Sequence, residues 1–496
     1  MARLNPQFYR DFSGGMATDL NLTLTPSSVV DLGLNLDFDA EIGSAVSRLG
    51  TSLIGAQLVD NNSILGLHQH VDHTNSSNNK LFATINASGG ATSVIYDVVA
   101  GTTSVTGLTA SKKMRFLTYG GATLAINGAD AERSYTPAGG WITTGGVFDL
   151  ADFPGSNSCE LVIEFLDRVY TAGDSSEPDR LHYSTIFDGS AISWGGDYID
   201  IEPEDGGGPI TALAKVPGYL LIFKERSVKR FNGQSAFPES LVDIGTPSQE
   251  SVVMGGGLVA FFSNSSEDAR GFYITNGGRP VPISHDTTRP IRKWVDAIPT
   301  ANDANIAGWA TDRVFAWSVG DITIDGFTVP NVVLRYNRIL NQWSVRSYPT
   351  EFKVFARYLV SGVNTIVGGD DDGQVIRVDK TGTYTDAPST TNIYWKLRTK
   401  HDHYGFNQRK SIGERVVVRG KDLHSSRVNI IVDENYDKPV SVNSNPLWKR
   451  VLSFFGVGNT VDGTTIAVEI AGETKGARAY IREIELPSVE RHFSYD

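Results

Sequence analysis

The sequence predicts an all-β protein, with a β-propeller of about seven blades and an additional C-terminal antiparallel domain like a β-sandwich. Three observations predict this class: short β-prone runs recur along the chain, glycine-rich turns separate them, and no long stretch has helical periodicity. Glycine accounts for 51 of the 496 residues, and many glycines occur in Gly-Gly, Asn-Gly or Asp-Gly pairs. Such pairs form the tight turns of β-hairpins.

The first element that shows the pattern clearly is the stretch 210–233, "ITALAKVPGYLLIFKERSVKRFNG". Two β-prone runs, "YLLIF" and "SVKRF", are separated by three charged residues and bounded by Pro217-Gly218 and Asn232-Gly233. Gly218 and Gly233 follow residues that favour turns, so we expect both to adopt positive φ angles as structural turn glycines.

Similar hairpins occur on both sides of this stretch. Comparable turns lie 38 to 56 residues apart, at Asn78, Gly121, Asp167, Gly218, Gly256, Asp312 and Gly362. A four-stranded propeller blade has a period of about 40–50 residues. One small sheet cannot bury both of its faces, whereas blades packed in a ring can, so the spacing favours a propeller over residues 62–384.

Two segments lie outside the repeat. Residues 1–61 are rich in turns and short strands, and we expect them to cross the ring or to add the outer strand that closes it. Residues 385–496 contain longer strands in which apolar and polar residues alternate, which is typical of a small antiparallel sandwich.

Composition excludes several classes of function. The chain has 44 basic and 56 acidic residues, a net charge of −12, which disfavours a DNA-gripping role. The single cysteine, Cys159, cannot form an intramolecular disulfide, and the N-terminus lacks the apolar core of a signal peptide. No apolar run approaches the ~18 residues that span a bilayer. We therefore expect synthesis in a reducing cytoplasm and no membrane anchor.

Three sequence patterns contain residue types that bind metals. They are His68, His70 and His73 in "LHQHVDH", His401 to His403 in "KHDHYG", and Asp370, Asp371 and Asp372 before Gly373. Polar loops and a hairpin turn explain them more simply, because structural zinc needs four ligands and the Asp-rich turn lacks the later acidic residue of a calcium loop. We predict no metal and no cofactor.

Catalytic motifs are equally weak. The stretch "YIDIEPEDGGG" contains Asp200, Glu202, Glu204 and Asp205, and paired carboxylates are the requirement of a glycosidase. Clustered carboxylates in an acidic, loop-rich chain are more often a solvated rim, and neither a nucleophile elbow nor a phosphate-binding loop is present. We predict that the protein is not an enzyme.

The N-terminal segment carries a resemblance to a known family. "FSGGMATDLN", with Phe12, Gly14, Gly15 and Asp19, is followed by a phrase containing Asn35, Gly43, Arg48 and Gly50. This order resembles the start of tail nozzle or hub proteins of short-tailed bacteriophages, also called packaged-DNA stabilisation proteins. Later phrases such as "RVYTAGD", "GYLLIFKERSVKRFNG" and "VVLRYNRILNQWSV" are similar to blades of the same proteins.

The resemblance implies a structural virion protein of the phage tail, made in the host cytoplasm. Such proteins form a homo-oligomeric ring, commonly a hexamer, below the portal and adaptor, carry tail fibres or spikes, and enclose the channel through which DNA leaves. The genomic DNA passes through this channel without sequence-specific binding. We expect Asp200, Glu202, Glu204 and Asp205 to face that channel, where like charge repels phosphate and lets DNA slide.

Two alternatives remain open. A glycan-binding or glycan-cleaving propeller at the virion tip would use aromatic platforms such as Trp309, Trp317 or Trp343. A cytoplasmic interaction scaffold would expose one hydrophobic face of the propeller and would need no virion.

Overall fold

The structure is a computed structural model of the chain. It describes residues 2–4, 7–18, 26–155, 158–202, 204, 206–234, 237–266, 270–286, 288–324, 326–360, 362–401, 410–412, 415–423, 425–432, 435–441, 449–454, 461–463, 466–486 and 489–491. Within these residues the structure is almost entirely β-sheet, with one short α-helix, α1 (Arg292–Asp296), and four short 3₁₀ turns, η1 (Ser76–Asn78), η2 (Leu150–Asp152), η3 (Gln249–Ser251) and η4 (Thr300–Asn305).

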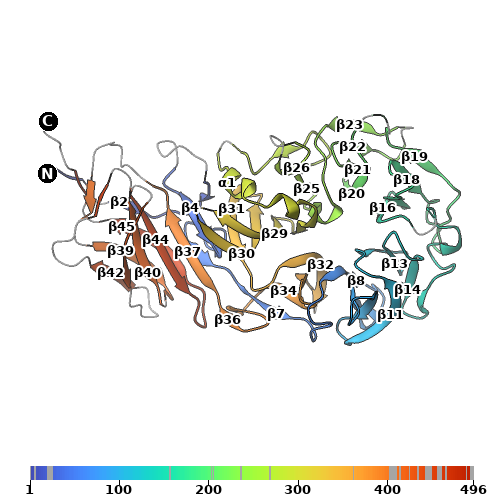
Figure 1. Cartoon of the computed structure of the whole chain (residues 1–496), viewed down its shortest axis with the longest axis horizontal. Helices are drawn as coiled ribbons and strands as arrows, with labels where there is room; N and C mark the ends of the chain where they lie inside the picture. Colours follow the sequence, from blue (N-terminus) through green and yellow to red (C-terminus); the bar gives the residue numbers. More distant parts are fainter. Residues whose placement is uncertain are drawn as a thin grey trace.

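Seven antiparallel blades of four strands each are present in the described part of the chain, and they follow one another around a ring (Figure 1). In the first six blades the strands lie in chain order from the innermost to the outermost. The first blade consists of β8 (Ile64–His70), β9 (Lys80–Asn86), β10 (Thr92–Asp97) and β11 (Thr102–Thr109), and the second of β12 (Arg115–Tyr119), β13 (Ala122–Ile126), β14 (Arg133–Thr136) and β15 (Gly140–Ile142). The third consists of β16 (Leu161–Phe165), β17 (Arg168–Ala172), β18 (Arg180–Tyr183) and β19 (Tyr198–Asp200). The fourth blade consists of β20 (Ile210–Val216), β21 (Tyr219–Lys224), β22 (Val228–Phe231) and β23 (Glu239–Val242), and the fifth of β24 (Val253–Gly255), β25 (Leu258–Ser263), β26 (Gly271–Thr275) and β27 (Val281–Pro282). The sixth consists of β28 (Ala307–Ala310), β29 (Val314–Ile324), β30 (Phe327–Asn337) and β31 (Gln342–Ser347).

The seventh blade is closed by the N-terminal segment. Its first three strands are β32 (Phe352–Val360), β33 (Val363–Asp370) and β34 (Val375–Lys380), and its outermost strand is β7 (Gly50–Leu53). Ile376 of β34 pairs with Leu53 of β7 in antiparallel register. Of the two roles expected for residues 1–61, the strand that closes the ring is therefore the one observed.

The rest of the N-terminal segment joins the C-terminal strands in a sandwich beside the propeller (Figure 1). One sheet has the order β42 (Lys449–Phe454), β39 (Arg415–Lys421), β45 (Tyr480–Leu486), β6 (Ala45–Ser47) and β5 (Leu36–Asp37), and β2 (Gln7–Tyr9) also pairs with β45. The other has the order β4 (Val29–Leu34), β37 (Tyr394–Thr399), β44 (Ile466–Glu473), β40 (Arg427–Val432) and β41 (Asn435–Ser441). Smaller sheets contain β1 (Ala2–Leu4), β46 (Val489–Arg491), β38 (Lys410–Ile412) and β43 (Val461–Gly463), and β35 (Thr385–Asp386) with β36 (Thr391–Asn392).

A single sheet connects the two parts of the molecule. β31, the outermost strand of the sixth blade, pairs with β3 (Gly15–Met16) and β4, and β4 pairs in turn with β37 of the sandwich. The result is a ten-stranded sheet that begins at the propeller axis with β28 and ends in the sandwich with β41. The predicted fold class, a propeller with an additional sandwich, is confirmed.

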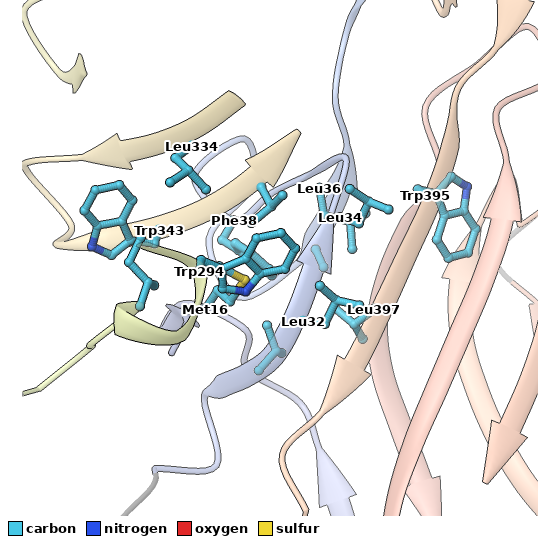
Figure 2. Close-up of a cluster of buried hydrophobic side chains, with 14 of the residues drawn as sticks. Met16, Leu32, Leu34, Leu36, Phe38, Trp294, Leu334, Trp343, Trp395 and Leu397 are labelled. Atoms are coloured by element: carbon cyan, nitrogen blue, oxygen red, sulfur yellow. The ribbon is translucent and has the colours of Figure 1, made fainter. Parts of the chain in front are cut away.

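The core continues across this connection (Figure 2). Apolar side chains of the N-terminal segment lie between tryptophans of the propeller and the first C-terminal strand of the sandwich. They are Met16, Leu32, Leu34, Leu36 and Phe38, packed with Trp294, Leu334 and Trp343 on one side and with Trp395 and Leu397 on the other. Each fully buried side chain of this size contributes about 1.5–3 kcal/mol, so we expect the propeller and the sandwich to be joined rigidly.

Candidate functional site

The residues that carry the family resemblance lie at the junction between the propeller and the sandwich. Phe12 is 1% exposed and belongs to the shared core. Gly15 and Gly43 adopt φ angles of +69° and +79°. A side chain at Gly14 would lie 2.5 Å from the carbonyl oxygen of Ser28. These positions therefore require glycine for conformation or space.

Gly50 and Asn35 belong to the same junction. A Cβ atom at Gly50 would lie 2.1 Å from the carbonyl oxygen of Thr385. Asn35 has a φ of 55° and donates its side-chain amide to the carbonyl oxygen of Tyr394 at 2.7 Å. Asp19, the remaining residue of the resemblance, lies outside the described residues.

Arg48 binds three segments at once. Its Nε atom donates to Asn35 Oδ1 at 2.9 Å, and its Nη1 atom donates to Asp386 Oδ1 at 2.8 Å. Its Nη2 atom donates to Asp386 Oδ2 at 2.5 Å and to the carbonyl oxygen of Ser347 at 2.8 Å. The guanidinium group also lies 4.3 Å from the centre of the Tyr348 ring. Arg48 therefore connects the N-terminal segment to the sixth blade and to β35.

A second buried ion pair network lies nearby, around Asp37. Arg346 and Arg478 each donate to one of its oxygens, at 2.7 and 2.8 Å. Burial alone would raise the pKa of Asp37, but the charges of Arg346, Arg335 and Arg478 hold it well below its ordinary value. Both networks are structural, because every charged group in them is already engaged by another protein group.

The loops of the propeller divide into two faces that differ in charge. Because neighbouring strands are antiparallel, the loop from the second to the third strand of a blade and the loop to the next blade emerge on the same face. On this face, which we call the acidic face, ten exposed acidic residues of the described chain lie in these loops, against three exposed basic residues. The acidic residues are Asp60, Asp152, Glu160, Glu177, Glu202, Glu204, Glu225, Asp243, Asp296 and Asp371, and the basic ones are Arg226, Arg292 and Lys293.

The opposite face has far less charge. Among the described residues, the loops from the first to the second strand and from the third to the fourth contain four exposed acidic residues and two exposed basic ones. These are Asp167, Asp188, Asp197 and Asp312, with Arg279 and Arg313. The negative charge of the propeller loops is thus concentrated on one face, which the sequence did not indicate.

The acidic residues predicted to face a channel lie at the outer part of this acidic face. Asp200 is in β19, the outermost strand of its blade, and forms an ion pair of 2.8 Å with Arg180. Glu202 pairs with Lys229 at 2.6 Å, and Glu204 is exposed. Asp205 lies outside the described residues. Whether these residues face the lumen of an assembled ring stays a prediction.

The histidines of "LHQHVDH" take part in packing between the first two blades. His68 Nε2 lies 2.7 Å from Thr118 Oγ1, His70 Nδ1 lies 2.8 Å from Thr123 Oγ1, and the two threonine hydroxyls are 2.7 Å apart. Burial lowers the pKa of His68 to about 4. His73 is exposed.

The Asp-rich turn fastens the end of the propeller to its beginning. Asp372 Oδ1 accepts the backbone N–H of Asn61 at 3.0 Å, and Asp370 Oδ1 accepts the backbone N–H groups of Asp372 and Gln374 at 3.0 and 2.7 Å. Asp371 Oδ1 accepts the backbone N–H of Glu351 at 3.3 Å. Among the described residues, no group of three or more His, Cys, Asp or Glu side chains is arranged to hold a metal ion. Asp402 and His403 of the third pattern lie outside those residues.

Other residues singled out in the sequence are structural. Trp317 and Trp343 are fully buried and Trp309 is 7% exposed, so none of the three can form the glycan platform considered for the propeller. Cys159 is buried, and burial raises its pKa to about 12. Gly218 and Gly233 have φ angles of +85° and +79°.

Two hollows bear on function. One, of about 200 Å³, lies among the innermost strands of the propeller and is lined by His68, Arg115 and Glu250, with Arg115 and Glu250 paired at 2.6 Å. The other, of about 570 Å³, lies on the outer face of the sandwich sheet formed by β37, β44 and β40. In the part of the chain that the structure covers, no helix is long and apolar enough to cross a membrane.

These features define a propeller with a sandwich built from both ends of the described chain. No known family model and no curated protein matches it. Among solved structures, it is similar to YCF48 from Cyanidioschyzon merolae, with 9% sequence identity, a TM-score of 0.37, and coverage of 66% of this chain and 98% of that one. It is also similar to the N-terminal domain of Nup159, with 12% identity, a TM-score of 0.36, and coverage of 70% of this chain and 99% of that one.

Proposed function

We propose that the protein is a non-enzymatic, ring-forming tail component of a short-tailed bacteriophage, located below the portal and adaptor, where it encloses the DNA exit channel and helps to retain and release the genome. The resemblance of residues 12–50 to nozzle proteins suggests the family. The charge distribution of the propeller is the structural observation that supports the role.

The acidic face suits a surface past which DNA moves. DNA carries one negative charge per ~1.7 Å of helix axis, and proteins that hold it neutralise several phosphates with Lys or Arg. A face with ten exposed carboxylates and three exposed basic groups repels phosphate instead. In the proposed ring this face is turned toward the channel.

The residues with catalytic potential support a structural role. Glu202, His68 and Asp372 each make an ion pair or hydrogen bond between neighbouring blades, to Lys229, Thr118 and the backbone of Asn61. The residues that carry the resemblance lie in the junction that fixes the sandwich to the propeller, as expected of a subunit that transmits force between neighbours.

The first test is the state of assembly. The purified full chain, alone and mixed with the portal and adaptor proteins of the same genome, is measured by native mass spectrometry and imaged by electron microscopy. We expect a closed ring, of six subunits by the resemblance. A chain that stays monomeric and does not bind the portal and adaptor would refute the proposal.

The second test is charge reversal on the acidic face. Virions carrying Glu204→Lys, Glu225→Lys and Asp243→Lys together should assemble but release DNA more slowly at low salt, and the effect should fade as salt shortens the Debye length. The matched control is Asp167→Lys, Asp197→Lys and Asp312→Lys on the opposite face, which should release DNA normally. Equal release by both triple variants at every salt concentration would contradict the orientation of the ring.

A further inference from the structure

The hollow on the sandwich lies over a regular grid of side chains. Register places Tyr394, Lys396 and Arg398 of β37 opposite Glu473, Ala471 and Glu469 of β44. On the other side of β44, Arg427 and Asn429 of β40 lie opposite Ala471 and Glu469. All eight side chains are on the outer face, because the residues between them, including Trp395, Val428 and Ile470, are buried in the sandwich.

The middle of this grid is hollow because Ala471 is small. Adjacent strands are about 4.8 Å apart, so Lys396 and Arg427 extend from positions about 5 Å to either side of Ala471. Gly472 also lines the hollow, whose volume is about 570 Å³, within the range of small-ligand sites. The floor of the hollow is therefore apolar, and two cationic side chains flank it.

Of the cationic side chains around Ala471, Arg427 is the one available to a ligand. Glu469 is only 2% exposed and is already held by Lys396 at 3.3 Å, by Arg398 at 3.0 Å and by the amide of Asn429 at 3.2 Å. Arg427 is exposed, and no described residue forms an ion pair or hydrogen bond with its side chain. The other carboxylate of the lining, Glu473, is exposed and lies two residues from Ala471 along β44, so Arg427 is the cation beside Ala471 that an anion can pair with.

One aromatic ring, that of Tyr394, lines the hollow, and a second, that of Phe327, lies beside Lys396. Tyr394, 42% exposed, lies two residues along β37 from Lys396, which is a distance of about 6.8 Å. Phe327, 40% exposed, belongs to the hairpin of β29 and β30 and lies 4.9 Å from the ammonium group of Lys396. A ligand whose anionic group lies over Ala471 can therefore pack a flat apolar face on Tyr394 and find further polar partners in Asn429 and Glu473.

We propose that this face of the sandwich binds an acidic saccharide, with a sugar carboxylate over Ala471 between Lys396 and Arg427 and a sugar ring against Tyr394. A sugar supplies a carboxylate, pairs of hydroxyl groups for the amide and carboxylate side chains, and an apolar C–H face for the aromatic ring. A peptide fits less well. The backbone groups of β37, β44 and β40 are paired with strands on both sides and offer no edge for strand addition. The apolar floor is only Ala471 and Gly472, enclosed by charged and polar side chains, so it is too small to be a groove for a helix.

The test uses the purified full chain on a glycan array that carries sialylated, uronic-acid-containing and neutral oligosaccharides, followed by titration calorimetry with the strongest binder. We expect carboxylated glycans to bind and the corresponding neutral or methyl-esterified glycans to bind at least 10-fold more weakly. Arg427→Gln should weaken binding by about 10- to 100-fold because it removes a charge-assisted contact, and Ala471→Leu should abolish binding by filling the hollow.

Controls separate the site from general effects. Arg313→Gln removes an exposed arginine far from the hollow on the propeller and should bind like the unmodified chain. Thermal unfolding should show that Arg427→Gln and Ala471→Leu are folded, and Tyr394→Ala provides a second variant that weakens binding without filling the hollow. Ring formation is measured separately, so the outcome does not depend on the proposed tail function.

Three results would overturn the inference. They are the absence of binding to any acidic glycan, equal binding of charged and neutral glycans, and binding that Arg427→Gln and Ala471→Leu leave unchanged. Binding of peptides with a free C-terminal carboxylate, but of no glycan, would assign the hollow to a protein partner instead.

Discussion

Removing Arg48 tests whether the buried junction stabilises the whole molecule. Arg48 is fully buried and makes five hydrogen bonds, two of them to the carboxylate of Asp386, which is 5% exposed. Arg48→Met preserves much of the side-chain volume but leaves that carboxylate buried without its cation. Breaking a buried pair in this way costs about 3–5 kcal/mol, so we expect the free energy of unfolding to fall by that amount.

The assay is urea unfolding followed by tryptophan fluorescence, because Trp294, Trp317, Trp343 and Trp395 are all fully buried. The matched control is Arg482→Met. Arg482 forms an ion pair with Glu41, and both side chains are more than a third exposed, so this change should cost less than about 1 kcal/mol.

A double variant separates the lost ion pair from lost packing. Arg48→Met combined with Asp386→Leu removes both charges, and replacing a buried pair by apolar groups is often close to neutral. We expect it to recover at least half of the stability lost in Arg48→Met. An Arg48→Met variant as stable as the Arg482→Met control would refute the reasoning about the junction.

Three further predictions concern single positions. Gly233→Val should lower the free energy of unfolding by about 1–3 kcal/mol, and by more than Gly218→Val does. Both glycines have positive φ angles, but only at Gly233 would the new Cβ atom meet a neighbour, Leu166 Cδ1 at 2.7 Å. Thermal unfolding of the two variants measures the difference. Burial raises the pKa of Asp370 from 3.8 to about 6. The stability that the protonated carboxyl group contributes to the fold is therefore fully present below about pH 4 and is lost as pH rises through 6. Between pH 4 and pH 6 the free energy of unfolding of the unmodified chain should fall by about 3 kcal/mol relative to that of Asp370→Asn. If the free energies of unfolding of the two proteins changed in parallel with pH, the raised pKa of Asp370 would be contradicted. Cys159 is 1% exposed with a pKa raised by burial to about 12, so a thiol reagent at pH 8 should label it only after urea unfolds the chain, and rapid labelling of the folded protein would show that the third blade opens.

Local patterns in the sequence were sufficient to predict the propeller. The runs "YLLIF" and "SVKRF" became β21 and β22, because alternating apolar residues between turn glycines specify a hairpin without distant information. For residues 1–61, local patterns leave two roles open, a segment that crosses the ring or a strand that closes it. Which of them holds depends on the pairing of β7 with β34, which no local pattern encodes.

The candidate sites were harder to predict for the same reason. Arg48 and Asp386 are separated by 338 residues, and the carboxylates of the acidic face gather only because alternate loops emerge on one side of each blade. The tryptophans considered as glycan platforms are in strands, but alternation alone does not reveal that Trp317 and Trp343 are buried, with their indole N–H groups donating to the carbonyl oxygens of Ser251 and Ile283 beside the fifth blade. The grid around Ala471 depends on the register of three strands far apart in the sequence.

The closing of the seventh blade by β7 also sets an order of events during synthesis. The ribosome makes β7 about 320 residues before its partner β34, an interval of roughly 15–65 s at about 5–20 residues per second. For that time the apolar residues of β4 and β5 have no β31 or β37 to pack against. A nascent chain of this protein therefore carries an unsatisfied N-terminal segment until β34 and β37 have been made, and we expect it to depend on chaperones during that interval more than a propeller closed by its own last strand would.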